Sequence, residues 1–284
     1  MPELPEVENI RQQLTRFLCP PKSRHTLTKV EIFRQKVIEG EIKNVLGAEV
    51  KRVRRFGKIL SIDFSNSYSI ICHVKMTGQL LYRGPNLKVP PKLSPKAGDI
   101  SSKHTHVIFT FDRDGKLYFN DYRRFGWMKI VLSKEVENLI LVAKLGPEPL
   151  KDLDCGKFAD ILRKSKKPIK SMLMDQTKIA GVGNIYANDA LWLSGINPKK
   201  HANSLTKSEQ GRLFKALERV LRRGIKTGGA SENNFVRPDG TDGNYQKYAL
   251  VYGWAGEPCK KCKTKIEKFT LSGRGTFWCP KCQK

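Results

Sequence analysis

The chain has 284 residues, and 53 lysines and arginines against 27 aspartates and glutamates give it a formal net charge of +26 at pH 7. This length is enough for one large domain or two of ordinary size, each with its own core. The charge predicts a polyanionic partner. No run reaches about 18 uninterrupted apolar residues, and the N-terminus lacks the apolar core of a signal peptide. We therefore expect no membrane span and a location in the reducing cytoplasm.

The basic residues recur in runs at 51–58, 163–170 and 219–226, where they alternate with apolar residues. Such interspersed charge is typical of a folded surface that follows a nucleic-acid backbone rather than of a basic tail. Any single run could instead be an ordinary solvated face. Taken together, the runs favour a DNA or RNA partner.

The first residues, Met-Pro-Glu-Leu-Pro-Glu, carry the most specific chemistry. Removal of Met1 would leave Pro2 with a free secondary amine, and an α-amine pKa of about 7.7–8.0 leaves roughly a tenth of it unprotonated at pH 7. Such an amine attacks a sugar C1′ and forms a Schiff base, which stays cationic and favours elimination of the 3′ phosphate. Glu3 could move the protons. Alternatively, Pro5 and the acidic residues simply begin a helix.

Apolar residues at helical spacing predict a helix over 5–17. Alternating segments then predict short strands over 28–33, 49–56, 59–64, 68–74, 105–111, 116–120 and 127–132. This series of strands and turns is typical of a β-sandwich or barrel. Residues 84–99, which include four prolines, predict a mobile loop.

After about Ser133 the pattern becomes helical, with amphipathic segments over 157–165, 169–175, 185–194 and 208–227. The segment 228–243 is rich in Gly, Asn, Asp and Ser, which predicts a flexible loop and a candidate lid over a reacting base. The sequence therefore predicts an α+β protein. We expect a β-sandwich domain with a leading helix over 1–133, a helical domain with the lid loop over 134–248, and a zinc finger over 249–284.

The zinc finger is predicted from two C-x2-C pairs separated by 16 residues; the cysteines are Cys259, Cys262, Cys279 and Cys282. This is the ligand spacing of a tetrahedral four-thiolate zinc site, which is structural because no open coordination position remains. Strand-like runs over 265–271 and 276–278 flank a turn at 272–275, so the metal would hold a hairpin. Disulfides are the alternative, but they are disfavoured in a reducing compartment. The remaining cysteines, Cys19, Cys72 and Cys155, are interpreted as small buried residues.

With these features assembled, the chain resembles the formamidopyrimidine-DNA glycosylase family, essentially from end to end. Six motifs in order carry the resemblance: Met1-Pro-Glu-Leu-Pro-Glu-Val-Glu8, Phe56-Gly-Lys58, His73-Val-Lys-Met-Thr-Gly78, Asp121-Tyr-Arg-Arg-Phe-Gly126, Ala180-Gly-Val-Gly-Asn-Ile-Tyr186 and Gly273-Arg-Gly-Thr276. The resemblance implies a bifunctional glycosylase and abasic-site lyase of base excision repair, with a helix-two-turns-helix DNA-binding domain. It would flip an oxidised purine such as 8-oxoguanine or a formamidopyrimidine out of double-stranded DNA, excise it and nick the strand by β,δ-elimination.

The resemblance also implies roles for individual residues. Pro2 is the Schiff-base nucleophile, Glu3 the proton donor and shuttle, and Lys58 a general acid or phosphate ligand. The implied DNA contacts are His73, Asn184 in the glycine-rich turn, Arg274 at the hairpin tip, and the void-filling side chains Met76, Arg123 and Phe125. We further expect a monomer that binds one structural zinc ion, acts on DNA with oxidised bases or abasic sites, and associates with the nucleoid.

Some positions depart from the usual family pattern. Asp189 stands where a glutamate is common, and Glu232-Asn-Asn-Phe235 is less basic than usual, so the details of base recognition stay open. One alternative is a pyrimidine-lesion enzyme of the endonuclease VIII branch, which Leu4 and the Arg123-Arg-Phe125 motif argue against. The other is a non-catalytic protein that binds damaged DNA, which a retained Met1 would favour because an acylated Pro2 nitrogen is not a nucleophile.

Overall fold

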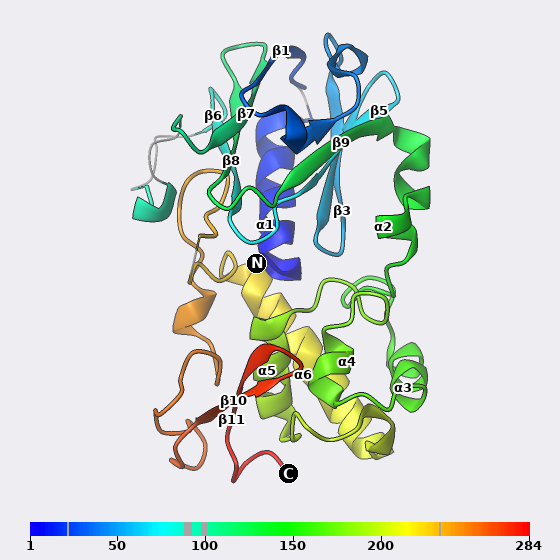
Figure 1. The fold of residues 1–284 in the computed structure, drawn as a ribbon, viewed down its shortest axis with the longest axis vertical. Coiled ribbons are helices and arrows are strands. Elements are labelled where there is room, and N and C mark those ends of the chain that lie inside the picture. The colour runs from blue at the N-terminus through cyan, green and yellow to red at the C-terminus, as the bar shows by residue number, and fades with distance from the viewer. Residues whose placement is uncertain (22, 88–92, 98–100, 233) are drawn as a thin grey trace. The chain divides into compact units, whose positions relative to one another are not determined.

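The computed structural model describes residues 1–21, 23–87, 93–97, 101–232 and 234–284 (Figure 1). The chain forms two compact units. The first unit contains Met1–Ala143 and Thr227–Asn244, and the second contains Lys144–Lys226 and Tyr245–Lys284. The segment Thr227–Asn244, called the 227–244 segment below, thus returns to the N-terminal unit although the helical half precedes it in the chain.

The first unit is a sandwich of two sheets, with the orders β1-β7-β8-β6 and β2-β9-β5-β4-β3. All neighbouring strands are antiparallel except β2 and β9, which pair in parallel. The strands are β1 (Leu27–Ile32), β2 (Ile38–Glu39), β3 (Val50–Phe56), β4 (Ile59–Phe64), β5 (Tyr68–His73), β6 (Gly78–Arg83), β7 (Thr105–Phe111), β8 (Lys116–Asp121) and β9 (Trp127–Leu132). Side chains from both sheets meet in one apolar core.

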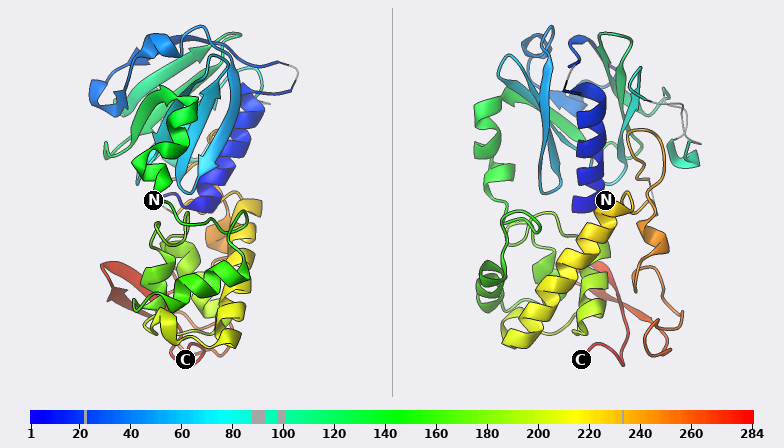
Figure 2. Two further views of the ribbon diagram at one scale, coloured as in Figure 1. Left: turned by 90° about the vertical axis from the view of Figure 1, so that its right-hand side faces the viewer. Right: turned by 180° about the vertical axis from the view of Figure 1, so that it is seen from behind.

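Helix α1 (Leu4–Leu18) lies between the two sheets and contacts the edge strands β3 and β6 (Figure 2). Its apolar side chains at helical spacing, Val7, Ile10, Leu14 and Phe17, are at most 2% exposed and belong to the shared core. Burial of each such side chain contributes about 1.5–3 kcal/mol. The helix that begins next to the candidate nucleophile is therefore part of the folding core.

The seven predicted strands are confirmed, with ends that shift by at most one residue. Two strands were missed, the two-residue β2 and the six-residue β6. In β6 the side chains of Leu80 and Tyr82 enter the main core, whereas Leu81 packs with Val236 of the 227–244 segment. Because both faces of β6 are covered, its sequence lacks the alternation that marks a half-buried strand.

The two predicted loops of the first unit fall partly outside the described residues. For the loop 84–99 these are positions 88–92 and 98–99, and for the lid 228–243 position 233. The remaining lid positions are mostly buried, which the composition alone did not indicate. Short 3-10 turns complete the description of both units: Gln35–Val37, Ile42–Asn44, Pro95–Ala97, Ser133–Asn138, Ala202–Ser204 and Tyr245–Lys247.

The second unit is helical and ends in a hairpin. It contains α3 (Cys155–Arg163), α4 (Ile169–Leu173), α5 (Asn184–Ser194), α6 (Lys207–Lys226), β10 (Glu267–Leu271) and β11 (Arg274–Trp278), and the short α2 (Ile140–Ala143) ends the first stretch of the first unit. The predicted helices are confirmed within two residues. The prediction that Cys155 is buried is wrong, because it begins α3 with an exposed side chain, whereas Cys72 is buried and Cys19 partly buried. Among the described residues, none of the helices combines the length and apolar character of a membrane span.

Asp189 in α5 is fully buried and anchors the chain that leads to the hairpin. Its carboxylate accepts hydrogen bonds from the Tyr245 hydroxyl at 2.8 Å and from the backbone N–H groups of Leu250, Val251 and Tyr252 at 2.9–3.1 Å. Burial raises the pKa of Asp189, and the hydrogen bonds act in the opposite direction. The departure from the family pattern at this position therefore lies in the packing of the second unit.

We expect the substitution Asp189→Asn to destabilise the protein. An amide turns two N–H donors toward groups that are themselves donors, and each buried donor left without an acceptor costs about 1–3 kcal/mol. Urea unfolding should show a free energy of unfolding lower by about 2–3 kcal/mol. The exposed Asp160→Asn serves as the control and should change it by less than about 0.5 kcal/mol. Equal stability of both variants would contradict the anchoring role.

Candidate active site and nucleic-acid interface

The N-terminal residues are held by the first turn of α1. Pro2 is buried, and Met1, which acylates its nitrogen, is 42% exposed. Glu3 is the N-cap residue, and its side chain forms a capping box with Glu6. The Glu6 carboxylate accepts a hydrogen bond from the Glu3 N–H at 2.7 Å and a second one from the Ala230 N–H at 2.8 Å. Glu6 thus joins the candidate catalytic residues to the 227–244 segment.

The β3–β4 hairpin presents Lys58 in its two-residue turn, which Gly57 enters with φ 55°. Arg55 fixes this turn by donating to the Gly57 carbonyl at 3.1 Å and by pairing with Glu8 of α1 at 2.9 Å. Burial acts to raise the pKa of Glu8, but hydrogen bonds from Arg11 and Arg55 outweigh it and hold that pKa below its usual value. The Lys58 side chain itself is 6% exposed. A buried ammonium group is thereby placed on a hairpin that is tied to the N-terminal helix.

His73 at the end of β5 is held in its neutral form. Burial and the positive charges of Lys75 and Lys58 lower the pKa of His73 from 6.5 to about 3. Its Nδ1 accepts a hydrogen bond from the Lys75 N–H at 3.0 Å, which leaves the remaining ring proton on Nε2. His73 and Lys58 together offer an N–H donor and a cation to the same neighbourhood, which suits an anionic ligand such as a phosphate.

The three predicted void-filling side chains lie on two loops of the first unit. Met76 is 38% exposed at the β5–β6 connection and Phe125 is 54% exposed after β8. The Arg123 guanidinium lies 4.9 Å from the centre of the Phe125 ring. An exposed Met, an exposed Phe and an arginine stacked on its ring are the kinds of side chain that enter a base stack and offer hydrogen bonds to a base edge.

A buried carboxylate holds these two loops together. Asp121, which is 1% exposed, accepts hydrogen bonds from the Thr77 hydroxyl and, at 2.6 Å, from the Gly126 N–H. The Thr77 hydroxyl oxygen in turn accepts from the Arg123 N–H at 2.9 Å. A side chain at Gly126 would place its Cβ 2.6 Å from the Phe119 ring, so glycine is required there. These hydrogen bonds therefore join the loop that carries Met76 to the loop that carries Arg123, and the two are called the Thr77–Asp121 loop pair below.

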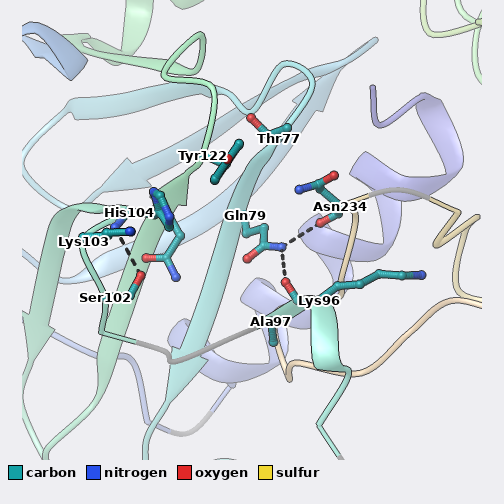
Figure 3. Close-up of a pocket in the computed structure, with 10 residues that line it drawn as sticks. Thr77, Gln79, Lys96, Ala97, Ser102, Lys103, His104, Tyr122 and Asn234 are labelled. Carbon is teal, nitrogen blue, oxygen red and sulfur yellow. Dashed lines mark hydrogen bonds between the residues drawn. The ribbon is translucent and has the colours of Figure 1, made fainter.

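A cavity of about 500 Å³ opens beside the Thr77–Asp121 loop pair, within the first unit (Figure 3). Its lining includes the side chains of Thr77, Gln79, His104, Tyr122 and Asn234. The Tyr122 ring is 66% exposed and lies 4.8 Å from the His104 ring, centre to centre. The sequence analysis names Thr77, Tyr122 and Asn234 only as members of motifs and does not name Gln79 or His104. Gln79 lies on strand β6, which was not predicted.

In the second unit, the glycine-rich motif forms the approach to α5. Gly181 has φ 86°, and Gly183 is the N-cap residue of the helix. Asn184 is the first helical residue, so the prediction that it lies in the turn itself is wrong by one position. The Gln176 carboxamide accepts from the Gly181 N–H at 2.9 Å and fixes the approach. The start of α5 offers backbone N–H groups and the positive end of the helix dipole, which suit an anion.

The four cysteines of the two C-x2-C motifs, Cys259, Cys262, Cys279 and Cys282, surround one point. Their sulfur atoms all lie within 4.8 Å of one another, with Cys259 and Cys282 3.9 Å apart and Cys262 and Cys279 3.4 Å apart. A tetrahedron with Zn–S bonds of about 2.3 Å has edges of about 3.8 Å. The donor set therefore fits one structural zinc ion, which would join the two ends of the β10–β11 hairpin.

The hairpin turn consists of Ser272 and Gly273, because Leu271 pairs with Arg274. Arg274 is thus the first residue of β11 rather than a turn residue, which corrects the prediction, and its side chain is exposed. Near the turn, the ammonium group of Lys170 in α4 donates to the Gly275 carbonyl and to the Thr276 hydroxyl, both at 2.8 Å. Lys170 is fully buried, so its assignment to a basic surface was wrong.

The basic run 51–58 is likewise not a uniform nucleic-acid surface. Arg52 and Arg54 both pair with the buried Asp63, at 2.8 and 2.6 Å. Burial acts to raise the pKa of Asp63, but hydrogen bonds from Arg54, Ser61 and Arg52 outweigh it and lower that pKa. These arginines stabilise the β3–β4 pair, so the sequence pattern overstated the number of cations available to DNA in this run.

Comparison with known proteins gives the same family along the whole chain. The formamidopyrimidine-DNA glycosylase N-terminal domain matches residues 1–128, the formamidopyrimidine-DNA glycosylase H2TH domain matches residues 145–235, and a zinc finger found in FPG and IleRS matches residues 256–284. A formamidopyrimidine-DNA glycosylase of Pelotomaculum thermopropionicum is 38% identical over 290 aligned positions, which cover 100% of this chain and 99% of that protein.

Solved structures agree with this result. The Lactococcus lactis Fpg in complex with DNA that contains an abasic site is 33% identical, covers 99% of both chains and superposes with a TM-score of 0.86. A MutM structure in complex with DNA that contains carbocyclic 8-oxo-G is 34% identical, covers 100% of both chains and has a TM-score of 0.85.

The neutral state of His73 can be tested by NMR. With a pKa of about 3, its ring resonances should stay constant from about pH 5 to pH 8, whereas an ordinary imidazole titrates near pH 6.5. Because the folded pKa lies below the unfolded one, the folded state binds fewer protons, and stability falls as the pH drops from 6.5 toward 3. His73→Gln assigns the resonances and should make acid unfolding less steep. A titration near pH 6.5 would contradict the assignment.

Zinc removal should unfold the hairpin selectively. A chelator or the substitution Cys279→Ser is expected to reduce the bound metal from one zinc ion per chain to none and to abolish amide protection in β10–β11, because the metal supplies the folding free energy of such small elements. Metal analysis and hydrogen exchange measure both effects. The exposed Cys155→Ser is the matched control and should keep the metal. Retention of zinc by Cys279→Ser would refute the four-cysteine site.

Proposed function

The chain belongs to the formamidopyrimidine-DNA glycosylase family, and we propose that it excises oxidised purines from double-stranded DNA and cuts the strand at the resulting abasic site. As a member of this family it is a DNA glycosylase of base excision repair, with a zinc finger whose four cysteines fit one structural zinc ion. The observation that carries the finer proposal is the Pro2-Glu3 pair at the start of α1, where the capping box orders the backbone of Glu3.

The proposed reaction begins once Met1 has been removed. The neutral Pro2 nitrogen attacks C1′ of the damaged nucleotide, the glycosidic bond breaks, and the base leaves with a proton supplied by a general acid, a role that we assign to Glu3. The sugar ring then opens at the C1′–O4′ bond, the amine proton passes to O4′, and the iminium cation that results acidifies the C2′ protons. Loss of one of them expels the 3′ phosphate, a second elimination expels the 5′ phosphate, and water hydrolyses the remaining iminium to release Pro2. The amine is regenerated, so the cycle is catalytic.

Phosphate binding is proposed for four residues. In the first unit, the Lys58 ammonium group and the Nε2–H of neutral His73 provide a cation and a donor. In the second unit, the start of α5 at Asn184 and the exposed Arg274 provide further donors. A neutral His73 supports this role because it can donate to a phosphate without adding a charge that burial would penalise.

The void left by the extruded base is proposed to be filled by side chains of the Thr77–Asp121 loop pair. Met76 and Phe125 would replace the lost stacking, and Arg123 would hydrogen-bond to the base left without its partner. Unstacking costs a few kcal/mol. Side chains that are already held in position offset more of this cost than flexible ones, since less conformational entropy is lost when they enter the DNA.

We also propose that the enzyme is a monomer in the cytoplasm that acts at the nucleoid, where its substrate lies. The division into a catalytic domain over 1–133, a DNA-binding domain over 134–248 and a zinc finger over 249–284 is retained as a proposal for the order of functions along the chain. The 227–244 segment is then the lesion lid. Its hydrogen bond to Glu6 supports this role, because Glu6 also binds the backbone of Glu3.

Borohydride trapping tests the nucleophile. Incubation with a duplex that contains 8-oxoguanine should give a covalent protein–DNA adduct, and peptide mapping should place it on Pro2 in protein whose intact mass lacks Met1. Glu3→Gln should slow excision by about 10²–10⁴-fold, the usual contribution of general acid–base catalysis. The control Gln12→Met, on the exposed side of α1, should trap like wild type. An adduct on an internal lysine such as Lys58 would disprove the proposed mechanism.

A further inference from the structure

The connection between β6 and β7 is bonded to the 227–244 segment. In its described part, the Ser94 N–H donates to the Gly240 carbonyl at 2.8 Å, and the Lys96 ammonium group donates to the Ser231 carbonyl. Leu93 packs so closely on Gly240 that a Cβ at that glycine would lie 2.6 Å from a Leu93 methyl carbon. Two regions of the first unit that are more than 130 residues apart in the chain therefore fit each other closely.

Gln79 of β6 joins the same two regions through one side chain (Figure 3). Its amide nitrogen donates to the Asn234 carbonyl at 2.7 Å and to the Lys96 carbonyl at 2.9 Å. The side chain is 7% exposed and lines the cavity beside Thr77. Both amide hydrogens are thus used on backbone carbonyls, so no shorter or apolar side chain can replace Gln79 without leaving these acceptors unsatisfied.

The other side of the 227–244 segment is bonded to the N-terminal helix and to itself. Ala230 donates to Glu6, and the Gly243 N–H donates to the Ser231 hydroxyl at 2.8 Å. Ser231 therefore lies between two fixed contacts, one with the helix that follows the candidate nucleophile and one with Lys96. The contacts of Gln79 and Lys96 therefore fix the position of the 227–244 segment relative to Glu3.

We propose that Gln79 and Lys96 are positioning residues for base excision, which hold the 227–244 segment in the place where it contacts the damaged base. This inference rests on the proposed function. It assigns the two residues to the excision step alone. An abasic site has no base for the segment to hold, and attack on its aldehyde requires only Pro2 and the phosphate contacts.

The test compares two substrates in single-turnover experiments with Gln79→Met and Lys96→Met. We expect excision of 8-oxoguanine to slow by about ten- to a hundredfold, since small misplacements of a positioning group have effects of this size. Cleavage at a preformed abasic site should change by less than about twofold. Lys116→Met on β8, which is exposed, is the matched control and should leave both rates unchanged.

Hydrogen exchange supplies the structural readout, and the amides of Ala230 and Ser231 should exchange faster in both variants. Equal losses on the two substrates in a variant that melts like wild type, unchanged rates, or unchanged exchange would each overturn the inference. Lys96 is partly exposed, so Lys96→Met decides the matter if Gln79→Met does not fold. A wild-type protein inactive on both substrates would instead refute the proposed function.

Discussion

The buried carboxylate of Glu6 is the contact on which the candidate active site depends. It accepts the Glu3 N–H, one of the donors that the start of a helix leaves without an intrahelical partner, and the Ala230 N–H of a segment 224 residues away. Gly229 has φ 83°, and its missing side chain leaves the room that Glu6 occupies, because a Cβ there would lie 2.8 Å from the Glu6 Cγ. One acidic side chain thus orders the residue next to the proposed nucleophile and the start of the proposed lid.

The distribution of charge explains how a chain with a net charge of +26 stays folded and still provides a DNA-binding surface. Some cations work inside the protein: Arg52 and Arg54 pair with Asp63, Arg55 pairs with Glu8, and Lys170 binds two oxygens near the hairpin turn. Others, such as Arg123 and Arg274, are exposed. Sequence counts cannot separate these groups, because a buried paired arginine and a phosphate-binding arginine have the same local pattern.

Much of the architecture could be predicted because its signals are local. The N-terminal helix, seven strands and the cysteine spacing are each fixed by residues close together in the chain. Strand β6 was missed because apolar partners cover both of its faces, and one of these partners, Val236, comes from the returning 227–244 segment. Lys170, Gln79 and Asp189 were misread or missed for the same reason. Their roles arise from backbone groups that are distant in sequence, and composition contains no trace of such contacts.

The site separates two demands that a bifunctional enzyme must meet. Chemistry on the sugar needs an amine, a proton carrier and phosphate ligands, and the residues proposed for these roles lie next to the start of α1, in the β3–β4 turn, and at the ends of strands and helices. Recognition of the base needs loops, which are intrinsically mobile, so each loop is bonded to a buried polar side chain: Asp121 for the loops that carry Met76 and Arg123, and Glu6 and Gln79 for the 227–244 segment. Satisfied buried polar groups are costly to break. They therefore give the loops a defined geometry before DNA binds, and the binding energy of the lesion can be used to extrude the base rather than to order the protein.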